Sequence, residues 1–394
     1  MSVTGHLAGG PGELVAVDLP PGEHWLEVLG DLWWRGVSVM PIENRLATRE
    51  KRALVRLARP SVVVTAGGST VFADPAPADP IRAAAVVATS GTGGRPRLAE
   101  LPRRALETAL ARSNAALGAA SDEPWLAVLS PAHIGGFLVY LREAALGTPV
   151  AAHARFQPEA LDGTGSAYAA VVPTMVRWLV RAKARLQGVT LVVGSAPLEP
   201  EVRDAAAGLG ARVVETYGLT EACGGVAYDR EPLRGTEFRI AQPSGEIQLR
   251  GPTDMEGYRH DPAATAGAFT LDGWLRTADL GALDRDGRLT VHGRSDDVIS
   301  SGGEKVWPEE VERALAQHPK VGAVAVAGRP DPEWGQHVAA WVVPESMDDP
   351  PTLEELREHC RDRLARFKTP RELFLVLELP KTASGKVRRP DLRT

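Results

Sequence analysis

A chain of 394 residues is long enough to hold two or three domains, each with its own hydrophobic core. Its net charge of −5 argues against a surface that binds nucleic acid, because such surfaces need clustered Lys and Arg. The two cysteines, Cys223 and Cys360, are too few for a disulfide framework or a zinc site, so we expect a globular protein that acts on small molecules in the reducing cytoplasm.

The N-terminal region alternates between patterns typical of helices and of strands. Residues 1–19 lack a basic segment followed by an apolar one, and no stretch nears the roughly 18 apolar residues that cross a bilayer, so we expect neither export nor a membrane span. Residues 25–32 carry apolar side chains at helical spacing, and residues 37–40 predict a short buried strand. Residues 46–57 and 61–65 repeat this order. Alternating helices and strands predict an α/β fold.

Helix and strand patterns continue past residue 90 and then change in texture. We expect a helix at residues 103–117 and strands buried on both faces at residues 125–129, 168–172 and 191–193. From Gly245 onward, short runs of alternating apolar and polar residues, at 246–250 and 289–292, are typical of antiparallel strands. These runs predict a small β subdomain.

Charged residues at 294–297 interrupt the apolar pattern and separate two expected domains. Beyond them a helix begins at Pro308, where proline lacks the N–H that a first helical turn leaves unused. Further elements follow: strands near 321–326 and 337–343, a helix near 353–365 and a strand near 373–377. We therefore expect an α/β protein whose large N-terminal domain (1–293) has mixed sheets, helices and the β subdomain, followed by a hinge (294–297) and a smaller α+β domain (298–394).

A glycine-rich segment, Thr-Ser-Gly-Thr-Gly-Gly-Arg-Pro-Arg at residues 89–97, follows the apolar run 83–88. The backbone N–H groups and hydroxyls of such a loop can surround phosphate oxygens. A Walker A motif would place Gly-Lys and then Ser or Thr where this chain has Pro-Arg-Leu at residues 96–98, so we do not expect a kinase-type phosphate loop. A plain glycine-rich turn is the alternative that this segment alone leaves open.

Residues 89–97 resemble the phosphate loop of the adenylate-forming superfamily, which includes acyl-CoA synthetases, luciferases and the adenylation domains of peptide synthetases. Gly93 replaces the second threonine of that loop, Arg97 replaces its lysine, and Leu98 replaces the next glycine. The resemblance implies that the segment binds ATP through Thr89, Ser90, Gly91, Thr92, Gly93 and Arg97.

A second motif of the superfamily is similar to Glu-Thr-Tyr-Gly-Leu-Thr-Glu at residues 215–221. The resemblance implies that Tyr217 flanks adenine, Thr220 contacts phosphate and Glu221 holds Mg²⁺, a hard cation that prefers carboxylate oxygens. A core aromatic is the alternative for Tyr217. The resemblance assigns three further residues to nucleotide binding: Gly194, Ser195 and Gly218.

The ribose residues come later in the chain. Gly-Trp-Leu-Arg-Thr-Ala-Asp at residues 273–279 resembles a segment whose final aspartate, here Asp279, accepts hydrogen bonds from ribose hydroxyls, with Ala278 in place of glycine. Arg294 also contacts ribose by this resemblance. A surface ion pair or a loop cap is the alternative for Asp279 and Arg294.

The remaining motifs belong to the C-terminal domain. By the same resemblance, Asp296 is the pivot about which this domain rotates, and Gly302 and Gly303 line the tunnel for the pantetheine of CoA, because glycine permits close backbone approach. Near the end of the chain, Ser-Gly-Lys places Lys386 where the superfamily has a lysine that neutralises the charge developing on the α-phosphate. A solvated lysine is the alternative, and we prefer it for Lys381.

The resemblance covers the whole chain and implies a two-step reaction. An acid and ATP give an acyl-AMP and pyrophosphate, and a thiol then attacks the activated carbonyl. The implied cofactors are ATP, Mg²⁺ and, as cosubstrate, coenzyme A.

Residues 130–137, Arg142 and residues 217–225 together resemble the compact o-succinylbenzoate-CoA ligases of actinobacterial menaquinone synthesis. That substrate has a second carboxylate, which a cation or strong donors must meet. We expect Arg142 to be the cation, with a helix-surface arginine as the alternative. His133, which by resemblance approaches the acyl pocket and the phosphate, is assigned to catalysis and substrate binding, and Gly225 to substrate binding. A packed core histidine is the alternative for His133.

Other functions stay open at this point. The enzyme could adenylate another aryl or fatty acid and transfer it to CoA, a carrier protein or an amine, and a non-catalytic nucleotide-binding relative is a third class. The joint presence of Glu221, Asp279 and Lys386 argues against the last, because a pure binder has no use for the distant lysine. We expect a carboxylic acid, ATP and CoA as partners. The sequence leaves open whether the chain forms a homodimer.

Overall fold

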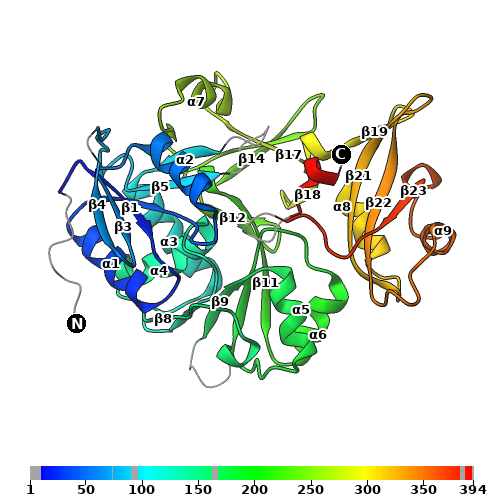
Figure 1. The fold of residues 1–394 in the computed structure, drawn as a ribbon, viewed down its shortest axis with the longest axis horizontal. Coiled ribbons are helices and arrows are strands. Elements are labelled where there is room, and N and C mark those ends of the chain that lie inside the picture. The colour runs from blue at the N-terminus through cyan, green and yellow to red at the C-terminus, as the bar shows by residue number, and fades with distance from the viewer. Residues whose placement is uncertain (1–9, 73, 90–95, 162–166, 382–386, 393–394) are drawn as a thin grey trace. The chain divides into compact units, whose positions relative to one another are not determined.

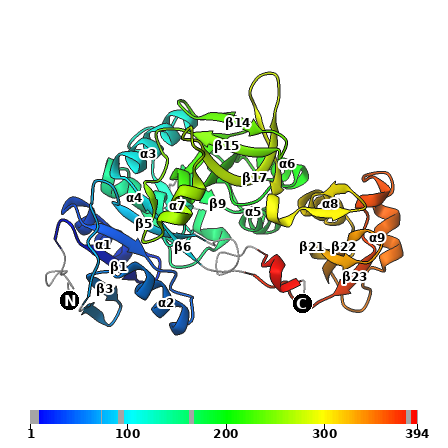
Figure 2. The same cartoon turned by 90° about the horizontal axis from the view of Figure 1, so that it is seen from above.

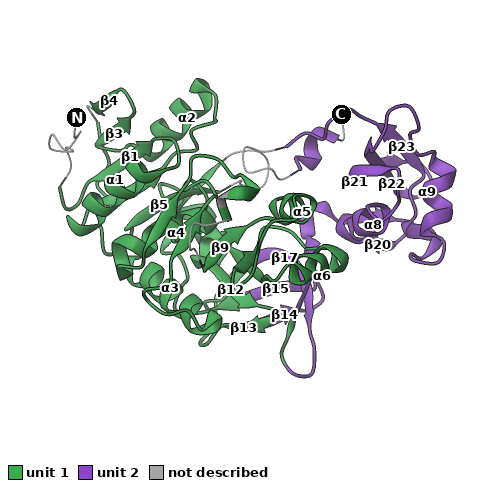
Figure 3. Ribbon diagram, turned by 90° about the horizontal axis from the view of Figure 1, so that it is seen from below, with its two compact units in different colours: residues 1–238, 249–276, 287–289 green, residues 239–248, 277–286, 290–394 purple. Residues whose placement is uncertain are grey.

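The computed structural model describes residues 10–72, 74–89, 96–161, 167–381 and 387–392 (Figure 1). Helices and mixed sheets make up the chain, so the predicted α/β fold class is confirmed. The chain divides into two compact units (Figure 3): residues 1–238, 249–276 and 287–289 form the first, and residues 239–248, 277–286 and 290–394 form the second. The predicted hinge lies within the second unit as a short 3₁₀ turn, Ser295–Asp297, and the predicted domain boundary stays a prediction.

The first sheet is built mainly from the N-terminal strands, in the order β16-β6-β5-β2-β1-β3-β4. The strands β1, β2, β3 and β5 pair in parallel, whereas β4, β6 and β16 are antiparallel to their neighbours. Their bounds are β1 Leu14–Asp18, β2 Ser38–Pro41, β3 Val62–Thr65, β4 Gly68–Val71, β5 Ala85–Thr89, β6 Arg97–Leu101 and β16 Gly257–Tyr258.

Two helices cover opposite faces of this sheet because successive side chains of a strand point to opposite sides. Val15 and Val17 of β1 share a core with α1 (Glu23–Trp34), whereas Leu14 and Ala16 share a different core with α2 (Thr48–Ala58). Both helices are visible beside β1 in Figure 2.

The second sheet has the order β13-β12-β11-β10-β9-β7-β8 and is parallel from β8 to β11. One face packs on α3 (Arg103–Leu117) and α4 (Ile134–Leu146), and the other on α5 (Pro173–Arg181) and α6 (Pro200–Gly208). The strands are β7 Trp125–Ala127, β8 Val150–Ala152, β9 Tyr168–Val171, β10 Thr190–Val193, β11 Arg212–Leu219, β12 Gly224–Tyr228 and β13 Glu231–Pro232.

A four-stranded sheet in the order β14-β15-β17-β18 forms the predicted β subdomain and supplies strand segments to both units. Its strands are β14 Glu237–Ala241, β15 Glu246–Arg250, β17 Leu275–Leu283 and β18 Leu289–Arg294, and the short helix α7 (Pro262–Ala268) lies between β16 and β17 in the sequence.

The C-terminal residues form a five-stranded sheet, β20-β19-β22-β21 with β23 beside β22. Helices α8 (Pro308–Leu315) and α9 (Leu353–Cys360) pack on one face through Val311, Leu315 and Leu356. The strands are β19 Ile299–Ser301, β20 Glu304–Val306, β21 Val321–Asp331, β22 Gly335–Pro344 and β23 Glu372–Leu375.

The predicted elements agree closely with the structure where the pattern is long. The helix expected at 103–117 has those bounds, while the helix expected at 353–365 ends at Cys360, and residues 361–363 form turns. No helix among the described residues is long and apolar enough to cross a bilayer.

Candidate active site

Glu221 lies on a tight turn between β11 and β12. Thr220–Ala222 form one 3₁₀ turn, and the chain leaves it through a left-handed Cys223 (φ 52°) and Gly224 (φ 94°). A Cβ at Gly218 would overlap the carbonyl of Gly224, so glycine is required where the two strands approach. The turn thus holds Thr220 and Glu221, two predicted site residues, where β11 ends and β12 begins.

The carboxylate of Glu221 is held by a residue from a distant part of the sequence. The Tyr258 hydroxyl donates to Glu221 Oε1 at 2.9 Å, and the Met255 N–H donates to the Glu221 carbonyl at 2.8 Å. Burial, together with the nearby Glu221, raises the pKa of Tyr258, so the phenol stays a donor at neutral pH. The guanidinium carbon of Arg97 lies 5.3 Å from the centroid of the same ring.

The two ends of the glycine-rich segment face each other. Thr89 on β5 is the register partner of Arg97 on β6. Ser90, Gly91, Thr92 and Gly93 lie outside the described residues. The structure therefore places Thr89 beside Arg97, Arg97 beside Tyr258, and Tyr258 beside Glu221.

Gly194, Ser195 and Tyr217 lie at the carboxyl ends of two adjacent parallel strands. Val193 of β10 pairs with Glu215 of β11, so the residues that follow both strands share one edge of the sheet. A Cβ at Gly194 would lie 2.8 Å from Thr216 Oγ1, and Ser195 adopts a left-handed φ of 75°. Ligands of open α/β sheets bind at such carboxyl edges, which suits the predicted nucleotide site.

His133 is paired with a buried carboxylate that the sequence did not single out. It is the N-cap residue of α4, and its Nε2 lies 3.5 Å from Glu43 Oε2. Glu43 is only 5% exposed and also accepts hydrogen bonds from Arg45 Nε at 2.8 Å and Nη2 at 3.1 Å. Although burial acts in the opposite direction, the neighbouring His133, Arg45 and Ser130 side chains hold the pKa of Glu43 well below its ordinary value. The pair is therefore an ionised carboxylate that orients an imidazole.

Arg142 lies in the core of the first unit and is 3% exposed. Its guanidinium stacks 3.6 Å over the ring of Trp125 and donates to Ser113 Oγ at 2.9 Å and to Asn114 Oδ1. Burial lowers its pKa to about 10, which leaves it a cation at neutral pH. The alternative of a helix-surface arginine is thereby corrected, because α4 presents this position to the sheet rather than to solvent.

Gly225 is connected to Arg142 through one tyrosine. A Cβ at Gly225 would lie 2.6 Å from Cε1 of Tyr228, and the Tyr228 hydroxyl donates to Ser113 Oγ at 2.9 Å. Arg142 also donates to Ser113 Oγ. Arg142 can thus influence the predicted acyl pocket through Ser113 and Tyr228, and its predicted direct contact with the substrate stays a prediction.

In the second unit, Asp279 and Arg294 form an ion pair. Arg294 Nη1 donates to Asp279 Oδ1 and to the Thr277 carbonyl, both at 3.1 Å. Ala278 adopts a left-handed φ of 57°, and its N–H donates to Glu246 Oε1 at 3.2 Å. The two predicted ribose residues are therefore neighbours on a constrained turn.

Asp296 and the glycine pair also lie in the second unit. Asp296 is exposed on the 3₁₀ turn Ser295–Asp297. Gly302 and Gly303 have φ of 60° and 84°, and the Gly302 N–H donates to the Trp334 carbonyl at 2.9 Å. Lys386 lies outside the described residues.

Comparison with known proteins decides which family these features belong to. The family model for AMP-binding enzymes matches residues 67–259, and the model for their C-terminal domain matches residues 310–386. A probable 2-succinylbenzoate-CoA ligase of Mycobacterium tuberculosis is 38% identical in an alignment of 324 positions that covers 78% of this chain and 83% of that protein. The chain belongs to the AMP-binding enzyme family.

Further relatives and solved structures of AMP-binding enzymes agree. The 2-succinylbenzoate-CoA ligase of Bacillus licheniformis is 35% identical over 341 residues, covering 79% of this chain and 70% of that protein. The o-succinylbenzoate CoA synthetase of Bacillus subtilis, solved with its acyl-adenylate intermediate, superposes with a TM-score of 0.89 at 25% identity over 98% of this chain and 89% of that chain. The ATP-bound MatB of Rhodopseudomonas palustris has a TM-score of 0.85 at 24% identity, covers 97% of this chain and 88% of that chain, and supports the fold alone.

The residues of this AMP-binding enzyme fit a magnesium ion that arrives with ATP. The described residues contain no cluster of three or more His, Cys, Asp or Glu that could hold a metal by itself. Mg²⁺ is usually bound by one or two carboxylates, with phosphates and waters as the other ligands. Glu221, a single oriented carboxylate, matches that donor set.

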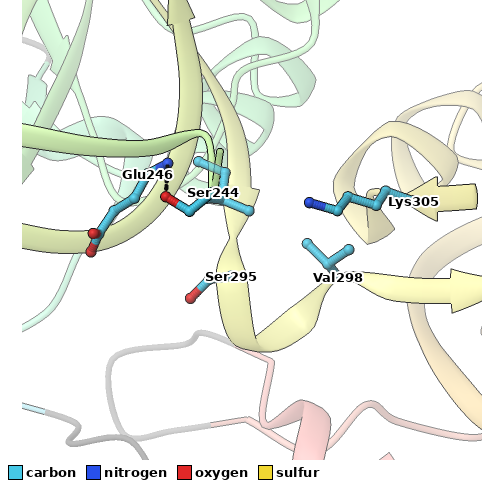
Figure 4. Close-up of a pocket in the computed structure, with 6 residues that line it drawn as sticks. Ser244, Glu246, Ser295, Val298 and Lys305 are labelled. Atoms are coloured by element: carbon cyan, nitrogen blue, oxygen red, sulfur yellow. Dashed lines mark hydrogen bonds between the residues drawn. The ribbon is translucent and has the colours of Figure 1, made fainter. Parts of the chain in front are cut away.

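A pocket in the second unit contains none of the predicted site residues of this AMP-binding enzyme. Figure 4 shows the residues that line it: Ser244, Glu246, Leu280, Ser295, Val298 and Lys305. Ser295 belongs to the predicted hinge. The Ser244 hydroxyl accepts from the Glu246 N–H at 3.2 Å.

Proposed function

We propose that this AMP-binding enzyme is a 2-succinylbenzoate-CoA ligase. It converts 2-succinylbenzoate, ATP and CoA into 2-succinylbenzoyl-CoA, AMP and pyrophosphate. The observation that carries the proposal is the similarity, over nearly the whole chain, to the Bacillus subtilis synthetase solved with its acyl-adenylate, together with 38% identity to the mycobacterial ligase. The cytoplasmic location and the homodimer are proposals of the same kind.

Adenylation is the first step. A carboxylate oxygen of the acid attacks the α-phosphorus of ATP, and the bond from that phosphorus to the pyrophosphate oxygen breaks. Glu221 would hold the Mg²⁺ that accompanies ATP, and that ion would offset phosphate charge. The Bacillus subtilis synthetase has also been solved in complex with ATP and a magnesium ion. Lys386 neutralises the negative charge that grows at the α-phosphate, and Arg97 and Thr220 bind phosphate oxygens.

Nucleoside binding is assigned to the residues that the family resemblance marks for adenine and for ribose. Tyr217, Gly218, Gly194 and Ser195 border the adenine, while Asp279 accepts hydrogen bonds from the ribose hydroxyls and Arg294 supports it. The existing ion pair between Asp279 and Arg294 supports this assignment, because it fixes the carboxylate before the ribose arrives.

Thioester formation is the second step. The CoA sulfur attacks the acyl carbon, the bond from that carbon to the AMP oxygen breaks, and the thiol proton is released. Gly302 and Gly303 give the pantetheine close access to the backbone. We assign residues 294–297 as the hinge, with Asp296 as pivot, about which the domain 298–394 rotates relative to 1–293 between the steps.

The acid is recognised by residues of the first unit. His133, oriented by Glu43, contacts the acyl group and the phosphate of the acyl-adenylate. Gly225 lines the acyl pocket. Arg142 supplies a cation behind that pocket. The contact with Glu43 supports this role for His133, because a carboxylate 3.5 Å from Nε2 orients the imidazole ring.

The test is pyrophosphate release from ATP and Mg²⁺ with a panel of acids, with and without CoA. We expect rapid turnover with 2-succinylbenzoate only when CoA is present, and weak turnover with benzoates and medium-chain fatty acids. Activity on another acid with none on 2-succinylbenzoate would overturn the substrate. Accumulation of acyl-AMP that CoA does not consume would indicate a carrier protein or an amine as acceptor.

A further inference from the structure

Tyr258 contacts the two charged residues of the first unit that we assign to ATP and its metal. Its hydroxyl donates to Glu221 Oε1 at 2.9 Å, and its ring lies under the guanidinium of Arg97, whose central carbon is 5.3 Å from the centroid. The residue is 37 positions from Glu221 in the sequence, so the pairing is a product of the fold.

The backbone around Tyr258 is held on several sides. Gly257 and Tyr258 pair with Glu100 and Ala99 of β6, and the Tyr258 N–H donates to Thr265 Oγ1 at 2.8 Å. The next residue, Arg259, is 4% exposed, and its guanidinium donates to the carbonyls of Ala58, Ala76 and Pro77 and to the carboxylate of Glu100. A hydroxyl mounted on such a base has little freedom to move away from Glu221.

One hydrogen bond is enough to orient a carboxylate. Glu221 has three side-chain torsions and lies partly exposed on a 3₁₀ turn, so without a partner its carboxylate would sample several rotamers. With Oε1 accepting from Tyr258, the direction of Oε2 is fixed, and its lone pairs, which accept from no other residue that the structure describes, can meet a cation.

We propose that Tyr258 is a positioning residue: its hydroxyl fixes the Glu221 carboxylate in the orientation that binds the magnesium ion of MgATP. The inference rests on the metal role of Glu221 in the proposed function. It adds that this role depends on Tyr258, a residue of β16.

The test is binding of Mn²⁺, as a probe for Mg²⁺, to the protein with ATP and no acid, measured by electron paramagnetic resonance. Tyr258→Phe keeps the ring and removes the hydroxyl, and we expect Mn²⁺ affinity to fall about tenfold, the usual loss when the partner of a metal ligand is removed. The matched control is Tyr168→Phe, which removes a hydroxyl that donates to Glu123 Oε2 at 3.0 Å on β9. We expect wild-type affinity from the control and similar melting temperatures from both variants.

A second background distinguishes this inference from the proposed function. Glu221→Gln should weaken Mn²⁺ binding, and adding Tyr258→Phe to it should then cost less than twofold, since the hydroxyl acts through the carboxylate. Wild-type Mn²⁺ affinity in Tyr258→Phe, with weak binding in Glu221→Gln, would overturn the positioning role alone. Wild-type affinity in Glu221→Gln would overturn the metal role assigned in the proposed function as well. Neither result depends on which acid the enzyme uses.

Discussion

Ala278 adopts a backbone conformation that glycine tolerates better. Its φ of 57° lies in the left-handed region, where a Cβ costs about 1–2 kcal/mol. Replacement by glycine removes that cost but adds about 0.4–1 kcal/mol of chain entropy to the unfolded state. The hydrogen bond from the residue 278 N–H to Glu246 Oε1, 3.2 Å long, does not depend on the side chain. We therefore expect Ala278→Gly to stabilise the fold by about 0.5–1 kcal/mol.

The assay is thermal and denaturant unfolding beside a control on the same strand. Ala282, also on β17, is exposed and has an ordinary negative φ, so Ala282→Gly should destabilise by about 0.5–1 kcal/mol. For domains of this size we expect Ala278→Gly to raise the melting temperature by about 2 °C and the control to lower it by a similar amount. Equal losses in both variants would refute the reasoning, because they would mean that residue 278 carries no left-handed strain.

Three further predictions concern the charged residues. The folded protein holds the pKa of Glu43 below its ordinary value, so the ionised carboxylate stabilises the fold above that ordinary value, and this stabilisation is lost as the pH falls below it. Between about pH 5 and 3 the wild type should therefore lose about 1–2 kcal/mol more stability than Glu43→Gln. Parallel denaturation curves for the two proteins would contradict this. Arg142→Met should lower the free energy of unfolding by about 2 kcal/mol, because Asn114 loses a charged donor beside Trp125; an unchanged midpoint in urea would argue that the guanidinium is not enclosed. Lys386→Ala should lose about 100-fold or more in adenylation rate and keep thioester formation from pre-made acyl-AMP, whereas equal losses in both half-reactions would count against its assigned role.

Local patterns predicted the parts of the fold that local physics determines. The fifteen residues of α3 have helical periodicity throughout, and the predicted bounds are those of the structure. The apolar run 83–88 contains most of β5, and the alternation at 246–250 gives β15. The predicted helix at 353–365 was too long, because the apolar spacing continues to Leu364 while the helix ends at Cys360.

The side-chain partners at the site were beyond such patterns. Glu43 pairs with His133 and Tyr258 with Glu221 across long sequence separations, and no periodicity marks either contact. Arg142 was predicted from the chemistry of a second substrate carboxylate, yet its nearest partners are Trp125, Ser113 and Asn114, which only the packing of α4 against the sheet brings together.

The central claim is that the acid is activated as an acyl-adenylate before it is transferred to CoA. The most direct measurement supplies 2-succinylbenzoate labelled with ¹⁸O in its carboxylates, together with ATP and CoA, and determines by mass spectrometry where the label goes. Because the attacking carboxylate oxygen stays on phosphorus when the thiol displaces AMP, we predict one ¹⁸O in the phosphate of AMP, none in pyrophosphate, and 2-succinylbenzoyl-CoA in equal amount. Label in inorganic phosphate with ADP as the nucleotide product, or unlabelled AMP, would contradict the account.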